Sequence, residues 1–161
     1  MVKLQFRRAE QYDVSGLDLI IGSRLSDEEK EEFRKRLDER RSAVFMLIGE
    51  EGPAAVSAMV FDAGDEELTE ALRRLYLSHL FVREDLKDKG YDGMMLEYTV
   101  NQANYMGYDY LTCKVMLDRP EELKLFTDHG FTSVIRTCID ENGSFVKLCR
   151  DVRIKIKCCG S

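Results

Sequence analysis

The chain has 161 residues, of which 44% are hydrophobic, and a formal net charge of −6 at pH 7. This length predicts a single domain over residues 1–161, with a core over about 2–150 and a tail over 151–161. The acidic balance argues against a nucleic-acid partner, and no apolar run approaches the roughly 20 residues that span a membrane. Because no apolar stretch follows Met1–Gln5, we expect no signal peptide and a cytoplasmic location.

The first third of the chain predicts a strand, two helices and a hairpin. Alternating apolar and polar residues are typical of a half-buried strand, and apolar residues at helical spacing favour a helix. Apolar runs on both sides of a turn favour a hairpin. The expected elements are a strand over 2–7, helices over 11–21 and 26–41, and strands over 43–48 and 54–61.

The second of these helices is highly charged. Ser26 and Glu29 have the spacing of a capping box at its start. Its apolar residues are Phe33 and Leu37. This pattern is typical of a solvated surface helix, and a wall of a substrate cleft is the alternative.

The rest of the chain predicts one strand–helix–strand crossover followed by a hairpin. Asn142-Gly143 between two strand-like runs is a strong hairpin signal. The tail over 152–157 alternates again, which predicts an eighth strand or an edge that pairs with a second copy in a homodimer. The expected elements are strand 75–82, a charged loop over 83–93, helix 94–106, strand 110–116, a short helix ending at 129–131, and strands 132–139 and 144–150.

This element order predicts an α+β fold, with a mixed central sheet of about seven strands flanked by about four helices. The stretch from Leu75 to Phe131 has the clearest functional signal, because a buried strand there leads into a glycine-bearing loop that opens a helix. Free N–H groups at a helix start attract anions, and glycine allows a ligand to approach the backbone closely. The stretch therefore predicts a phosphate site, and a capped helix start with solvated lysines is the alternative.

Two segments of this stretch resemble the GNAT superfamily of acetyl-CoA-dependent N-acetyltransferases. Leu80–Gly93 looks like that family's strand and pyrophosphate-binding loop. Glu122–Phe131 looks like its last helix, which usually ends in a Leu/His-Gly-Phe corner. The resemblance implies a three-layer fold, acetyl-CoA as co-substrate without a metal, and an acceptor amine on a small molecule, a lysine or a protein N-terminus.

The resemblance also implies the residues that bind the cofactor. The family's loop reads Gln or Arg, two residues, Gly, one residue, then Gly or Ala, and these positions correspond to Lys87, Gly90 and Asp92. Asp92 departs from the pattern, since a carboxylate about 4 Å from a phosphate costs about 1 to 4 kcal/mol. We expect it to turn away and cap the N–H of Met94 or Met95. The implied cofactor-binding residues are Leu80, Phe81, Val82, Lys87, Asp88, Lys89, Gly90, Tyr91, Asp92, Gly93, Arg119 and Phe126.

The positions that hold the acid and base in this family are changed. The Tyr of the last helix corresponds to Phe126, and two Glu positions correspond to Tyr76 and Lys114. The remaining catalytic candidates are Tyr76, His79 and Ser78, all on strand 75–82. His79 has the unperturbed pKa of a base, and the Tyr76 phenol can relay a proton. For His79, a satisfied core residue is the alternative.

Two functions stay open at this point. The first is transfer of an acetyl group from acetyl-CoA to a primary amine by direct attack, in which positioning supplies most of the rate. An acidic rim from Asp62, Asp65, Glu66 and Glu67 would favour a cationic acceptor. The second is a catalytically degenerate GNAT-like module that binds a CoA ester or a protein partner without turnover.

The five cysteines predict reduced thiols. Cys113, Cys138 and Cys149 lie in strand-like runs and are expected to be small core residues. The adjacent Cys158 and Cys159 are candidates for metal binding or redox chemistry, although no His or other Cys lies near them in the sequence.

Overall fold

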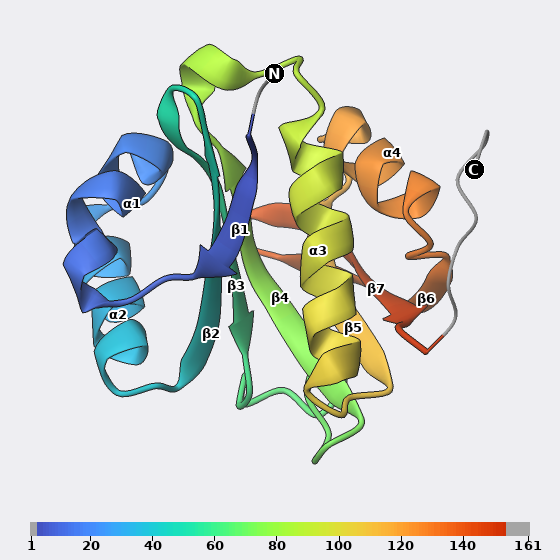
Figure 1. Cartoon of the computed structure of the whole chain (residues 1–161). Coiled ribbons are helices and arrows are strands. Elements are labelled where there is room, and N and C mark those ends of the chain that lie inside the picture. The colour runs from blue at the N-terminus through green and yellow to red at the C-terminus, as the bar shows by residue number, and fades with distance from the viewer. Residues whose placement is uncertain (1–2, 154–161) are drawn as a thin grey trace. The chain divides into compact units, whose positions relative to one another are not determined.

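The computed structural model describes residues 3–153 (Figure 1). Seven strands form one mixed sheet in the order β1-β2-β3-β4-β5-β7-β6, which confirms the expected α+β fold. The elements in chain order are β1 (Gln5–Arg8), η1 (Gln11–Asp13), α1 (Val14–Ile21), α2 (Asp27–Asp38), β2 (Ser42–Gly49), β3 (Gly52–Val60), β4 (Arg74–Val82), η2 (Glu84–Leu86), α3 (Tyr91–Tyr105), β5 (Tyr110–Met116), α4 (Pro120–Asp128), β6 (Ser133–Asp140) and β7 (Gly143–Asp151).

The contacts of the chain divide into two compact units. Unit 1 contains the described residues up to Phe61 together with Ser78–Thr99, and unit 2 contains Asp62–Leu77 and the described residues from Val100 onward. β4 and α3 therefore contribute residues to both units. A single domain over residues 1–161 stays a prediction.

Unit 1 is built on the antiparallel strands β1, β2 and β3. Because successive side chains of a strand point to opposite faces, β2 and β3 supply two apolar surfaces. One surface, with Val44 and Met46, belongs to the core cluster that includes residues of α1 and α2. The other contacts the first half of α3, where the Phe45 ring meets the Tyr98 ring edge-on at 5.6 Å. Covering on both faces explains why these strands have continuous apolar sequences.

Unit 2 is built on β5, β7 and β6, which pair antiparallel in that order. The first residues of β4 pair with β5 in parallel, from Arg74↔Tyr110 to Tyr76↔Thr112. After α4, Phe131 is fully buried and its ring meets the Phe126 ring edge-on at 5.2 Å. The His-Gly-Phe corner therefore anchors the last helix in the core of this unit.

Two predicted helix boundaries are wrong, and each has a local cause. α3 begins at Tyr91 rather than Met94, because the Gly90 carbonyl already accepts the first helical bond, from the Met94 N–H at 3.2 Å. α2 ends at Asp38 rather than near Arg41. There Arg40 has a φ of +56°, which a continuing helix cannot accommodate.

Several other expectations can be compared with the structure over residues 3–153. Within this range no helix is both long enough and apolar enough to cross a membrane. Cys113 and Cys149 are buried and Cys138 is partly buried, all as free thiols. The strand expected over 152–157 and the pair Cys158-Cys159 fall largely or wholly outside the described residues, and so does the edge proposed for a homodimer.

Candidate functional site

The loop after β4 is held by Arg83, the first residue beyond the strand. The Arg83 guanidinium donates to the carbonyls of Glu51 at 2.9 Å and Pro53 at 3.0 Å, in and after the β2–β3 turn. The same side chain binds both oxygens of Asp85, at 2.7 and 3.2 Å. Leu86, three residues further along the loop, is buried. One arginine thus fixes the start of the loop against the neighbouring turn of unit 1.

Gly90 lets the chain turn into α3. It has a φ of +78°, in the region that favours glycine, and a Cβ placed there would meet nothing within 4 Å. The amides of Gly90, Tyr91 and Asp92 precede the first helical bond, so they have no partner within the helix. An open backbone at the positive end of a 15-residue helix is suited to an anion.

The charges around this helix start are mixed. Lys87 pairs with Glu84 at 2.7 Å and Lys89 with Glu51 at 3.4 Å, and all four side chains are well exposed. Such exposed pairs contribute about 0 to 1 kcal/mol, so an incoming phosphate can recruit either lysine at small cost. Asp88, also in the loop, is exposed and has a φ of +70°.

The predicted hydrogen bond from the Met94 or Met95 amide to Asp92 does not form. The Asp92 carboxylate accepts a hydrogen bond from the N–H of Gly93 at 2.7 Å rather than from Met94 or Met95. Tyr91, by contrast, is buried and lies in the first helical turn instead of the loop. The Gly93 amide is therefore already bonded, and the amides of Gly90, Tyr91 and Asp92 are the ones left for a ligand.

The last residues of β4, Leu80–Val82, are partly buried and lead directly into this loop. The register of β4 with β5 ends at Tyr76↔Thr112, several residues earlier. Phe81 packs against the core cluster of unit 1, and the Arg24 guanidinium lies 5.4 Å from the centre of its ring. This end of β4 is therefore well anchored on its Phe81 side.

Ser78 and His79 form a hydrogen-bonded pair in the second half of β4. Ser78 Oγ lies 3.2 Å from the Ala58 carbonyl and 2.8 Å from His79 Nδ1. The hydroxyl has one proton and the carbonyl can only accept. Both contacts are satisfied when Ser78 donates to Ala58 and His79 Nδ1–H donates to Ser78. This tautomer leaves a free lone pair on His79 Nε2, as a base requires.

The surroundings of His79 keep its ring neutral. Its ring meets that of Phe33 edge-on at 5.3 Å and lies 5.7 Å from that of Phe81. Burial lowers the pKa of His79 to about 4, the nearby Arg36 charge acts in the same direction, and the Glu29 charge opposes them. The imidazole is therefore uncharged at neutral pH.

Three further candidates lie in unit 2. Burial raises the pKa of Tyr76 to about 12, so its phenol is protonated at neutral pH. Arg119 precedes α4 and forms an exposed ion pair with Glu122 at 3.6 Å. Phe126 is buried against Phe131, which gives it a packing role in this structure.

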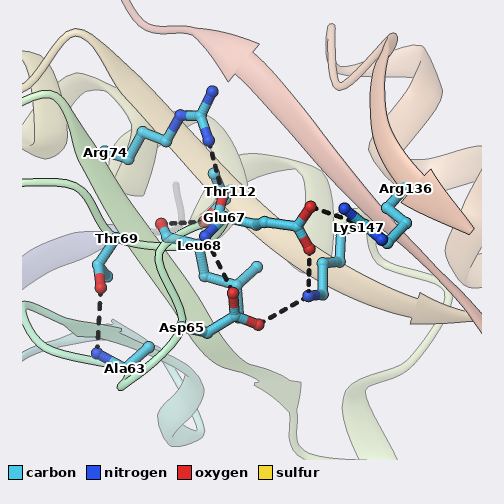
Figure 2. A network of polar contacts seen from close by, with 9 residues as sticks. All are labelled: Ala63, Asp65, Glu67, Leu68, Thr69, Arg74, Thr112, Arg136 and Lys147. Atoms are coloured by element: carbon cyan, nitrogen blue, oxygen red, sulfur yellow. Dashed lines mark hydrogen bonds and ion pairs between the residues drawn. The ribbon is translucent and has the colours of Figure 1, made fainter. Parts of the chain in front are cut away.

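Sequence reasoning missed an ion-pair network around the buried Lys147 in unit 2 (Figure 2). Lys147 Nζ, on β7, lies 2.7 Å from Asp65 and 2.8 Å from Glu67, and the second oxygen of Glu67 pairs with Arg136 at 2.8 Å. Two of the four carboxylates expected to attract a cationic acceptor are thus neutralised. The sequence did contain a signal for this network, because Lys147 lies inside the apolar run Phe145–Cys149. A buried charge is unstable without a partner, so a lysine in such a run indicates an acidic partner elsewhere in the chain.

The fold can be compared with solved structures. A scan against protein-family models finds no match, and a search of curated proteins finds none either. Among solved structures, a Desulfovibrio desulfuricans protein assigned to the GNAT family of acetyltransferases is 13% identical, with a TM-score of 0.73 over 93% of this chain and 99% of the other.

Two other structures extend this comparison. A variant of the spermidine N-acetyltransferase of Vibrio cholerae is 12% identical, with a TM-score of 0.74 over 92% of this chain and 94% of the other. An acetyltransferase of Bacillus subtilis, solved in complex with CoA, is 16% identical, with a TM-score of 0.69 over 92% and 99%. The chain therefore has the fold of GNAT acetyltransferases, as the sequence resemblance implied.

Proposed function

We propose that this protein is an N-acetyltransferase that transfers an acetyl group from acetyl-CoA to a primary amine. The observation that carries the proposal is the open helix start at Gly90, which follows β4 and the loop over 83–89 in a fold shared with acetyltransferases. The pyrophosphate of the co-substrate would accept hydrogen bonds from the amides of Gly90, Tyr91 and Asp92. Lys87 and Lys89 would add positive charge, and the backbone of Leu80–Val82 would bind the pantetheine arm.

The chemistry follows from the Ser78–His79 pair. The nitrogen of a neutral acceptor amine attacks the thioester carbon, so that an N–C bond forms and the C–S bond breaks. As the N–C bond forms, the nitrogen becomes acidic and His79 Nε2 takes its proton. Ser78 positions the imidazole through Nδ1. The thiolate leaves and takes a proton from water, and His79 passes the proton it removed to the hydroxide that remains, so that the imidazole is neutral again. Tyr76, Arg119 and Phe126 have no step in this mechanism.

Binding of acetyl-CoA tests the loop. Gly90→Glu should weaken binding, measured by calorimetry, by at least about tenfold, because the new side chain adds a negative charge and fills the space next to the open amides. Gly107→Glu is the matched control, since Gly107 also has a positive φ, of +93°, with nothing within 4 Å of a Cβ. Equal affinity of the two variants would show that the phosphates bind elsewhere.

Turnover is tested by following thiol release from acetyl-CoA in the presence of a panel of amines and peptides. Release that depends on the amine supports the transferase. Tight binding without release from any acceptor would instead identify a module that holds a CoA ester. The carboxylate of Asp92 at the helix start is the feature that favours this second reading, since it opposes the charge of the diphosphate.

A further inference from the structure

Arg36 on α2 has a donor that its surroundings leave unused. Arg36 Nε binds Glu32 one helical turn earlier, at 3.2 Å. Nη1 of the same guanidinium is buried and has no hydrogen-bond partner among the residues that the structure describes. A buried donor of a charged group is strongly disfavoured without a partner. Nη1 is therefore suited to an acceptor that the chain itself does not supply.

This donor lies on the side of α2 that contacts the candidate base. Phe33 precedes Arg36 by three residues, so the two share a helix face. The Phe33 ring meets the His79 ring at 5.3 Å, and the Arg36 charge is close enough to His79 to act on its titration. The free Nε2 of His79 and the spare Nη1 of Arg36 are thus presented by neighbouring elements of unit 1.

Three carboxylates on α2 and in the loop after β4 already have hydrogen-bond or ion-pair partners. Glu29 accepts the Ser26 N–H in the capping box at 3.0 Å, Glu32 binds Arg36, and Glu84 pairs with Arg24 and Lys87. A cationic group would therefore find these acidic side chains already engaged, whereas an anionic group would find a spare guanidinium donor. Guanidinium and carboxylate are complementary in charge and geometry.

We propose that the acceptor amine also carries a carboxylate, as a free amino acid does, and that Arg36 Nη1 binds this carboxylate while the amine faces His79. This inference rests on the proposed transferase function and names the acceptor class for the same site. It also gives α2 a role as a wall of the acceptor site rather than a purely solvated helix. The structural neighbours do not decide the class, since one is a spermidine N-acetyltransferase and another is named for phosphinothricin.

The test compares amino acids with their amides, which keep the amine and remove the carboxylate charge. With wild-type protein, kcat/KM expressed per neutral amine should be at least about tenfold higher for the preferred amino acid than for its amide, since loss of the carboxylate also lowers the pKa of the amine. Arg36→Met keeps the apolar part of the side chain and should lower kcat/KM for the amino acid about 10- to 100-fold, through KM, while the amide changes by less than about twofold. Arg34→Met is the matched control, because Arg34 is an exposed neighbour that pairs with Asp18.

A second measurement separates this inference from the transferase function. In the absence of acetyl-CoA, millimolar amino acid should shift the side-chain NMR signals of Arg36 and His79. The amide should shift neither signal, and in Arg36→Met the amino acid should no longer shift the signal of His79. Shifts without turnover would uphold the carboxylate site and refute the transferase. Turnover in which amides or polyamines equal amino acids, or in which Arg36→Met slows both alike, would overturn the inference. Absence of both shifts and turnover would refute both proposals.

Discussion

Replacing His79 with phenylalanine should reduce the loss of stability between pH 7 and pH 5. The folded protein holds the pKa of His79 at about 4, against 6.5 for an ordinary imidazole, because burial disfavours the charged ring. As the pH falls below 6.5, the unfolded chain binds a proton here that the folded chain does not. Stability therefore falls with pH from about 6.5 to about 4, and this term disappears when the ring is replaced.

The size of the effect follows from the two pKa values. Between pH 7 and pH 5 the unfolded imidazole becomes almost fully protonated while the folded one stays neutral, so the free energy of unfolding falls by about 2 kcal/mol. Carboxylates with lowered pKa values, such as those of Asp13 and Asp65, lose stabilising charge at lower pH. They are also present in the variant, so their contribution cancels in the comparison.

The assay is urea unfolding at both pH values, followed by circular dichroism, since the chain has no tryptophan. Wild type should lose about 2 kcal/mol more than His79→Phe on going from pH 7 to pH 5. The chain has one other histidine, and His129→Gln is the control for replacing a histidine elsewhere in the chain. Equal losses in wild type and His79→Phe would refute the burial argument. Nitrogen NMR of the ring would then test the Nδ1–H tautomer separately.

Three other substitutions test the site and the core. Asp92→Asn keeps an acceptor for the Gly93 amide but removes the charge, so acetyl-CoA should bind up to about tenfold more tightly by calorimetry; weaker binding would contradict the placement of the diphosphate. Lys147→Met leaves two partly buried carboxylates without their shared cation and should cost about 2 to 3 kcal/mol in urea unfolding, whereas no loss would show that the network is not stabilising. Phe126→Ala should cost about 3 to 4 kcal/mol, and a loss below about 1 kcal/mol would contradict its burial against Phe131.

Much of the fold could be predicted because each element has a simple pattern of apolar residues. β2 and β3 are covered on both faces and therefore have continuous apolar sequences, which a short run of residues reveals. The start of α3 was harder to predict, since Gly93 suggested a loop. The buried ring of Tyr91 makes the first turn part of the core instead, and this is a tertiary effect that local propensity does not contain.

In the candidate site too, features set by local sequence could be predicted, and features set by contacts between distant segments could not. Gly90 was predictable, because a glycine between a strand and a helix commonly marks a backbone conformation that other residues avoid. The tautomer of His79 was not, since it depends on the Ala58 carbonyl of the neighbouring strand. The partners of Lys147 lie about 80 residues away in sequence, and no local pattern connects them. Contacts that join distant segments are what single-sequence reasoning lacks.

In the proposed mechanism, the low pKa of His79 limits which amines can serve as acceptor. An imidazole with a pKa of about 4 cannot remove a proton from an alkylammonium ion, so the acceptor must arrive already neutral. At pH 7 roughly one α-amino group in ten is neutral at a peptide N-terminus, against about one lysine side chain in 2,500. If the base removes a proton only from the attacking nitrogen, and not from the free ammonium ion, the site favours amines with low pKa values. Selectivity would then come from the acceptor's own acidity together with the groups that hold it, and the base would add little discrimination.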